Sequence, residues 1–170
     1  MSRVVTIGRK GILPFVLAGA TVAGGLERWE GNIKEVYADK LAYNVPTMCA
    51  GMTDWKAVVG TKLTDDQCRV INKATLVKYG TAIAYCTEWK HLTQYRFDAL
   101  TLFAVNVGVS AACGSSAVKA INRGDIKGGC DLIALKPNGT PNWSYAGGKY
   151  VRGLYNRRLF ERDWCLRGLS

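Results

Sequence analysis

Two acidic side chains, Glu30 and Asp39, stand nine residues apart and are the residues of this chain best suited to catalysis. Glu30 follows Trp29, and a carboxyl group against an apolar wall tends to stay protonated and can act as an acid. Asp39 lies between Ala38 and Lys40, where it can stay ionised. One protonated and one ionised carboxyl group are what cleavage of a glycosidic bond requires. Because the chain has 13 acidic residues, this spacing alone does not establish the chemistry.

Other catalytic systems have little support in the sequence. The single histidine, His91, lies in a polar stretch before a helix cap and is expected to be a loop residue. No CxxC pair and no cluster with zinc-ligand spacing is present, and no glycine-rich phosphate-binding motif follows a strand pattern. We therefore expect neither a metal nor a cofactor.

Six well-separated cysteines favour disulfides and hence an exported protein. The alternative is six buried thiols in a cytosolic protein. Six cysteines allow 15 pairings in principle. Pairing of sequence neighbours is the favoured arrangement because each bond could link adjacent elements: Cys49–Cys68, Cys86–Cys113 and Cys130–Cys165.

The first 26 residues have the form of an export signal. Basic residues occur among residues 1–10, residues 11–26 carry no charge, and Glu27 follows. As a helix the uncharged run would span roughly 24 Å, which is short of a hydrocarbon core. Three readings remain open: a signal peptide cleaved after Ala20, a weak anchor that stays attached and later leaves the bilayer, or a buried core helix.

The remaining chain, residues 27–170, reads as one mainly helical α+β domain. We expect a short helix over residues 27–35 and a small β-hairpin region over residues 36–51. The capping box at residues 64–67 opens a helix towards Lys78, and Thr93 caps a buried helix that ends at Gly108. Three further helices are expected at residues 115–124, from Asp125 to before Pro137, and at residues 155–166.

The formal net charge of +10 suits an anionic partner such as nucleic acid, a membrane surface or an acidic polymer. No recognisable nucleic-acid-binding motif accompanies this charge, so we expect no nucleic-acid partner. Arg157, Arg158 and Arg162 are expected to form a solvated basic face on the last helix, with a general attraction to an acidic wall.

Several blocks occur in the order found in phage-type lysozymes, glycoside hydrolase family 24, which the chain resembles from residue 27 to residue 168. The most telling are Trp29-Glu30-Gly31, Tyr37-x-Asp39 and the stretch from Val45 to Thr53. The resemblance continues through residues 92–94, 98–108, 121–125, 145–149 and 153–166.

The resemblance implies roles for three residues. It makes Glu30 the proton donor, Asp39 the second catalytic acid and Thr47 a residue that helps to position water. Two departures from the family pattern occur. Asp39 and Thr47 are eight residues apart where six are common, and Met52 stands where the family often has histidine. The second departure indicates that this position does not carry the proton transfers.

The resemblance also implies a function: hydrolysis of the β-1,4 bond between N-acetylmuramic acid and N-acetylglucosamine in peptidoglycan, with inversion. A lytic transglycosylase and a non-enzymatic wall-binding protein are the alternatives. We expect a monomer that binds peptidoglycan. Residues 11–26 are expected to hold it at the periplasmic side of the host inner membrane before release, because some phage lysozymes carry such a segment. Residues 145–149 are expected to form a tight loop, with contact to the substrate as the alternative.

Overall fold

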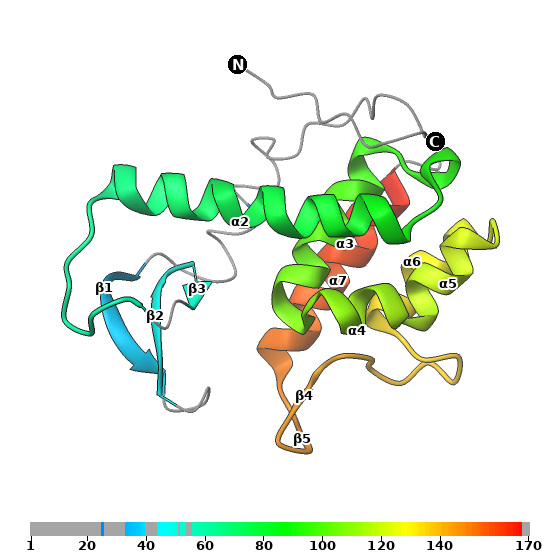
Figure 1. Cartoon of the computed structure of the whole chain (residues 1–170). Helices are drawn as coiled ribbons and strands as arrows, with labels where there is room; N and C mark the ends of the chain where they lie inside the picture. Colours follow the sequence, from blue (N-terminus) through cyan, green and yellow to red (C-terminus); the bar gives the residue numbers. More distant parts are fainter. Residues whose placement is uncertain (1–24, 26–32, 40–43, 51, 54–55, 168–170) are drawn as a thin grey trace. The chain divides into compact units, whose positions relative to one another are not determined.

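The computed structural model describes residues 25, 33–39, 44–50, 52–53 and 56–167 (Figure 1). The chain divides into two compact units, with the described residues up to Val77 in one and those from Lys78 onward in the other. The expected anchor, residues 1–26, lies outside the described residues apart from Gly25. Among the helices that the structure describes, none combines the length and apolarity needed to cross a membrane.

The first unit contains a three-stranded antiparallel sheet in the order β1-β2-β3. Its strands are β1 (Ile33–Asp39), β2 (Val45–Cys49) and β3 (Met52–Thr53). The Asn44 amide donates to the Asp39 carbonyl at 2.8 Å, and Asn44 adopts a positive φ of 59°, which asparagine tolerates in turns. The hairpin expected over residues 36–51 is therefore confirmed.

The expected helix over residues 27–35 is wrong at its end, because β1 begins at Ile33. Residues 27–32 lie outside the described part of the chain. The reason is tertiary: β1 pairs with β2 on one edge, and on the other its backbone bonds to residues 61–63. The Val36 amide donates to the Thr61 carbonyl at 2.9 Å, and the Leu63 amide donates to the Lys34 carbonyl at 2.6 Å. The secondary-structure propensity of a short segment does not reflect bonding partners that lie so far along the chain.

The long helix α2 (Asp65–Cys86) begins at the predicted capping box. The Gln67 amide donates to Thr64 Oγ1 at 3.2 Å, and the Gln67 side chain accepts from the Thr64 amide at 2.8 Å. The helix continues eight residues beyond Lys78, to Cys86. A small core of Val36, Met48, Cys49 and Cys68 joins the sheet to the first turns of this helix.

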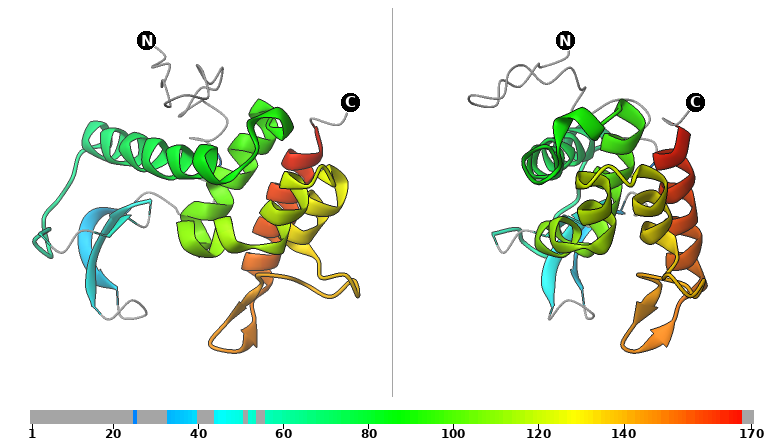
Figure 2. Two further views of the ribbon diagram at one scale, coloured as in Figure 1. Left: turned by 45° about the vertical axis from the view of Figure 1, so that its right-hand side comes forward. Right: turned by 90° about the vertical axis from the view of Figure 1, so that its right-hand side faces the viewer.

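The second unit is helical apart from one two-stranded hairpin (Figure 2). Its elements in chain order are η3 (Trp89–His91), α3 (Gln94–Val107), α4 (Val109–Gly114), α5 (Ser116–Asn122), α6 (Ile126–Ala134), β4 (Tyr145–Ala146), β5 (Lys149–Tyr150) and α7 (Arg152–Leu166). The predicted cap at Thr93 is confirmed, because its side chain accepts a hydrogen bond from the backbone of the following turn. Ser115 and Asp125, where the next two helices were expected to begin, accept the same kind of bond. Helix α4 was not expected, and α7 begins three residues earlier than expected.

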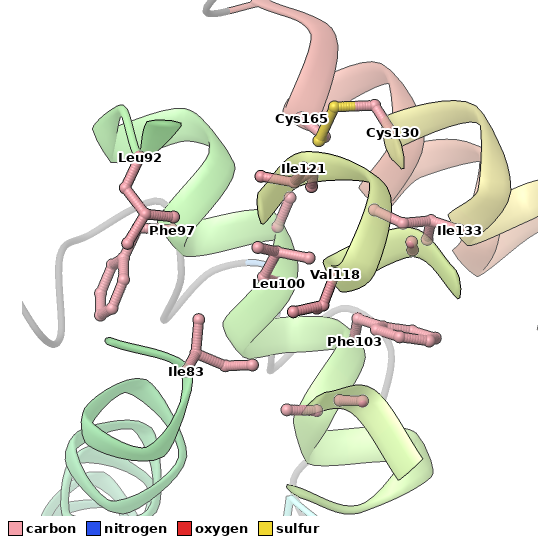
Figure 3. Close-up of a cluster of buried hydrophobic side chains, with 14 residues drawn as sticks. Ile83, Leu92, Phe97, Leu100, Phe103, Val118, Ile121, Cys130, Ile133 and Cys165 are labelled. Atoms are coloured by element: carbon pink, nitrogen blue, oxygen red, sulfur yellow. A yellow bond between two sulfur atoms is a disulfide. The ribbon is translucent and has the colours of Figure 1, made fainter. Parts of the chain in front are cut away.

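Helix α3 is the central helix of the second unit, as predicted. Phe97, Leu100 and Phe103 are fully buried and pack with residues of α5 and α6 (Figure 3). The backbones of α5 and α6 approach closely at Gly129, where an added Cβ would lie 2.8 Å from the Ala117 carbonyl oxygen. Glycine is therefore required at that contact.

The three disulfides join the pairs favoured from the sequence: Cys49–Cys68, Cys86–Cys113 and Cys130–Cys165. The first lies in the first unit and the other two in the second. In the chain-entropy model, loops of 19, 27 and 35 residues each contribute about 3–4 kcal/mol to stability.

The expected solvated basic face on α7 is wrong. Arg157 and Arg158 are 3% and 0% exposed, and both donate to the Glu161 carboxylate, which is also fully buried. Arg157 also donates to the Leu102 carbonyl at 3.1 Å, and the Arg158 guanidinium lies 5.1 Å from the centre of the Phe103 ring. Glu161 stands four residues after Arg157 and three after Arg158, so one carboxylate can pair with both cations and make their burial possible. Only Arg162 of the three remains near the surface, paired with Asp131 at 2.6 Å.

A second buried carboxyl group, Asp98, gives the stability of the second unit a pH dependence. Burial raises the pKa of Asp98 from its ordinary value of 3.8 to about 6, and hydrogen bonds from Gln94 and Trp164 oppose the rise. The folded state therefore binds a proton between these two pH values that the unfolded state does not. It follows that the free energy of unfolding falls as pH rises through this window.

We predict that Asp98→Asn removes this pH dependence, because an amide keeps an oxygen acceptor for Gln94 but does not titrate. In denaturant unfolding, the parent should lose on the order of 2 kcal/mol from this group between about pH 4 and pH 6. The variant should lose little over that range. Asp163→Asn, at a largely exposed position on α7, is the matched control and should keep the parent's slope. An unchanged slope in Asp98→Asn would contradict the argument.

Candidate active site

Asp39 and Thr47, two of the three predicted site residues, lie on neighbouring strands of the small sheet. Asp39 is the last residue of β1 and pairs with Val45 of β2, while Thr47 pairs with Tyr37. Since side chains two residues apart on a strand share a face, the Asp39 and Thr47 side chains lie on the same face as diagonal neighbours. The register therefore brings them together although eight residues separate them in the sequence.

The Thr47 hydroxyl has a defined orientation. Thr47 is 2% exposed, and its Oγ1 donates to the Val45 carbonyl at 3.0 Å. A hydroxyl has one hydrogen and two acceptor lone pairs, so this bond uses the hydrogen and leaves the oxygen to act as an acceptor. Asp39 is half-buried and sits where β1 ends, next to the turn. A carboxylate and a hydroxyl acceptor thus face the same side of one hairpin.

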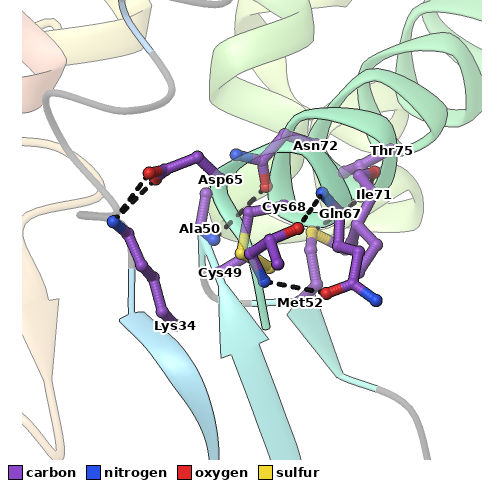
Figure 4. Close-up of a disulfide and its surroundings, with 11 residues drawn as sticks. Lys34, Cys49, Ala50, Met52, Asp65, Gln67, Cys68, Ile71, Asn72 and Thr75 are labelled. Carbon is purple, nitrogen blue, oxygen red and sulfur yellow. Dashed lines mark hydrogen bonds and ion pairs between the residues drawn. A yellow bond between two sulfur atoms is a disulfide. The ribbon is translucent and has the colours of Figure 1, made fainter. Parts of the chain in front are cut away.

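The strand that carries Thr47 is fixed to helix α2 (Figure 4). The Cys49–Cys68 disulfide joins the end of β2 to the first turn of α2. One turn further along the helix, Asn72 Oδ1 accepts from the Ala50 amide at 3.3 Å. The β1–β2 hairpin, which carries two of the predicted site residues, is therefore held at its β2 end by a covalent bond and a buried side chain.

Met52 has a structural contact that suits its replacement of histidine. Its Sδ accepts from Thr75 Oγ1 of α2 at 3.0 Å, and the side chain packs against the small core that includes Cys49 and Cys68. The side chain is half-buried and has no group that transfers protons. Met52 thus connects β3 to α2 and takes no part in acid–base chemistry.

Glu30, the third predicted site residue, lies outside the described residues. The inverting or retaining outcome depends on the separation of the two carboxyl groups, so it stays a prediction.

The remaining sequence candidates lie in the second unit. His91 is the last residue of η3 and not a loop residue, and its carbonyl accepts from the Arg96 guanidinium at 2.7 Å. The predicted tight loop at residues 145–149 is part of the β4–β5 hairpin, which turns at Gly147 and Gly148. Over the residues that the structure describes, no group of three or more potential metal ligands occurs.

Sequence reasoning missed the buried ion-pair network of α7. The available signal was the spacing of Glu161, three and four residues after Arg158 and Arg157, within a segment otherwise expected to be solvated.

The fold is that of lysozymes. The structure superposes on the active form of the P1 phage endolysin Lyz with a TM-score of 0.74 at 23% identity, covering 91% of this chain and 88% of that one. It also resembles the endolysin from Escherichia coli O157:H7 phage FAHEc1, with a TM-score of 0.72 and 28% identity over 89% of this chain and 94% of that one.

The sequence model of the family described as "Phage lysozyme" matches residues 27–161. The chain belongs to the phage lysozyme family: it is a phage endolysin, a glycoside hydrolase that degrades peptidoglycan. Among its relatives is a protein named SAR-endolysin from Bacteriophage PS119, which is 33% identical over 148 residues, or 87% of this chain and 83% of that protein.

Proposed function

We propose that this endolysin is a muramidase that hydrolyses the β-1,4 bond between N-acetylmuramic acid and N-acetylglucosamine and so causes lysis of the host cell. In this proposal Glu30 protonates the leaving oxygen, Asp39 is the general base, and Thr47 orients the attacking water. The observation that carries it is the shared face of Asp39 and Thr47 on the β1–β2 hairpin.

The two side chains suit a water molecule placed between them. The Cα atoms of diagonal neighbours across a strand pair lie roughly 7–8 Å apart, which leaves room for one water. Because the hydrogen of Thr47 is donated to the Val45 carbonyl, the Thr47 oxygen can accept a hydrogen bond from one O–H group of that water. Asp39 accepts a hydrogen bond from the other O–H group and takes up its proton as the water oxygen attacks the anomeric carbon. This arrangement fits inversion, in which a base activates water on the face opposite the leaving group.

A water site also favours hydrolysis over transglycosylation. A lytic transglycosylase cleaves the same bond with a single acid, and a hydroxyl of the substrate itself takes the place of water. Such an enzyme does not need a carboxylate and a hydroxyl acceptor to position a water molecule. Mass spectrometry of the released muropeptides separates the two reactions, because only transglycosylation leaves an anhydro product.

We propose further that residues 1–26 form a signal and anchor segment in front of a lysozyme domain of residues 27–170. The relatives named SAR-endolysins support export and tethering at the inner membrane before release into the periplasm. Composition also supports a weak anchor. The uncharged run contains Leu, Val and Phe, which favour insertion into a bilayer, but also many Gly and Ala residues, which favour it only weakly. The released enzyme acts as a monomer on peptidoglycan.

Glu30→Gln is expected to lower lytic activity by orders of magnitude, because an amide fills the same space but donates no proton to the leaving oxygen. The measurement is loss of turbidity of chloroform-treated Gram-negative cells, with circular dichroism to confirm folding. Glu35→Gln, an exposed position on β1, is the matched control and should lyse cells like the parent. Lysis by Glu30→Gln at the parent's rate would refute the assignment.

Thr47→Val is expected to lower kcat by about 10- to 100-fold, because valine has the shape of threonine without an oxygen to hold the water. Thr47→Ser keeps the oxygen and should retain most of the activity. Thr61→Val, at an exposed threonine beside the other edge of β1, is the control for the chemical change alone. Equal rates for Thr47→Val and Thr47→Ser would contradict a role for the oxygen.

Replacing Gly19 and Gly24 together by leucine is expected to trap the protein in the membrane and delay lysis, because a more apolar segment inserts more stably. The measurements are membrane fractionation and the time of lysis in culture. The same two glycines replaced by serine should leave release at its normal time or advance it. Release of the leucine variant on schedule would count against the anchor. A wild-type protein beginning at Thr21 would instead identify a cleaved signal peptide.

A further inference from the structure

The β4–β5 hairpin of the second unit exposes a cluster of tyrosines that the catalytic assignment does not use. Tyr145 and Tyr150 are each 48% exposed and form a cross-strand pair with ring centres 5.9 Å apart. Tyr155, in the first turn of α7, extends the row, with its ring centre 6.1 Å from that of Tyr150. The hairpin projects from the N-terminal end of α7 (Figures 1 and 2). We call these three rings the tyrosine surface.

The tyrosine surface is built on a rigid support. Gly147 and Gly148 both adopt positive φ, at 56° and 76°, as a tight two-residue hairpin turn requires. At the base of the hairpin, Trp143 packs edge-on against the buried Phe103 with ring centres 5.3 Å apart. Ser144 is fully buried, and its carbonyl accepts from the Val151 amide at 2.8 Å. Little conformational entropy is therefore lost when these rings meet a ligand.

The same region is positively charged. No acidic residue occurs between Asp131 and Glu161, whereas five basic residues do. Two of the five, Arg157 and Arg158, are buried against Glu161. The other three are exposed and lie at or beside the hairpin: Lys136, Lys149 and Arg152. The Lys136 ammonium lies 5.8 Å from the centre of the Tyr145 ring, which places a cation directly at the tyrosine surface.

Exposed aromatic rings flanked by cations match a sugar polymer that carries carboxylates. Aromatic faces pack against the apolar C–H faces of pyranose rings, while phenol hydroxyls and ammonium groups bond to hydroxyls and carboxylates. A lipid surface fits less well. The hairpin tip is Ala146-Gly147-Gly148, which offers no large apolar side chain to enter a bilayer.

We propose that the tyrosine surface and its three cations bind the peptidoglycan strand and its carboxylate-bearing stem peptides, as a second contact in addition to the catalytic hairpin. The proposal rests on the proposed function, because it takes the substrate polymer as the ligand. The surface holds the enzyme on an insoluble polymer between cleavage events, and its contribution lies in binding and not in the chemical step.

The test measures co-sedimentation of the full-length chain with purified sacculi. All proteins carry Glu30→Gln, so that binding is observed without digestion. The Tyr145→Ala/Tyr150→Ala variant should raise Kd by about tenfold, which corresponds to 1.4 kcal/mol. The Lys149→Gln/Arg152→Gln variant should also bind more weakly, and its affinity should depend less on salt than the parent's. The matched control is Tyr85→Ala/Lys90→Gln, an exposed tyrosine and lysine on other elements, and it should bind like the parent.

Vesicles containing phosphatidylglycerol provide the competing arm. All variants share residues 11–26, so a difference between them reports only the hairpin. Equal vesicle binding together with weaker binding to sacculi supports the proposal. The proposal is overturned if the hairpin variants bind more weakly to vesicles alone, or if both bind sacculi like the parent. It is also overturned if the Tyr85→Ala/Lys90→Gln control loses as much affinity for sacculi as they do. Thermal melting identifies a tyrosine variant that is unfolded, in which case the charge variant decides.

Failure of the catalytic proposal is recognised separately. If Glu30→Gln itself solubilises sacculi, the assignment of Glu30 fails, while the comparison of bound fractions on ice still tests the hairpin. If Glu30→Gln is inactive and the hairpin variants bind like the parent, only the tyrosine surface is refuted.

Discussion

The attachment of one short sheet to one helix is the constraint on which the candidate active site depends. The sheet has three strands, the last only two residues long, and its small core is completed by Cys68 of α2. The Cys49–Cys68 disulfide ties the end of β2 to α2, and Asn72 and Thr75 add hydrogen bonds from the next two turns. Thr47 stands two residues before Cys49, so the position of its hydroxyl oxygen depends directly on this attachment.

A different constraint organises the second unit, where α7 brings two guanidinium groups into the core. One carboxylate, Glu161, accepts from both, and the Leu102 carbonyl and the Phe103 ring of α3 provide further contacts. Removing a single partner from such a group leaves an uncompensated buried charge, which costs more than the pair contributes. The network therefore fixes how α7 lies against α3. Because Arg157 and Arg158 are buried in it, the exposed positive charge near the β4–β5 hairpin comes from Lys136, Lys149 and Arg152.

The sequence was informative where a local rule decides the structure. The caps at Thr64 and Thr93 depend on a side chain and the backbone within four residues, and both occur as predicted. The helices expected to begin at Ser115 and Asp125 are capped by those residues. Prediction was poorer where the structure depends on residues far away in the sequence. The strand at residues 33–35 is an example, because β1 bonds to residues 61–63. The burial of Arg157 and Arg158 likewise requires the carbonyl and ring that α3 supplies. Asp39 was a candidate from its spacing to Glu30 and Thr47 only from the resemblance, and the strand register places the two on one face.

The disulfides link the folding of this enzyme to the compartment in which it acts. Together they contribute about 10 kcal/mol in the chain-entropy model, which is comparable to the whole stability of a typical domain. They form in an oxidising compartment and not in the reducing cytosol. Since one of them holds the strand that carries Thr47, a chain still in the host cytosol would lack both much of its stability and the covalent attachment of that strand to α2. Under the export proposed above, the disulfides form only after the chain has left the cytosol.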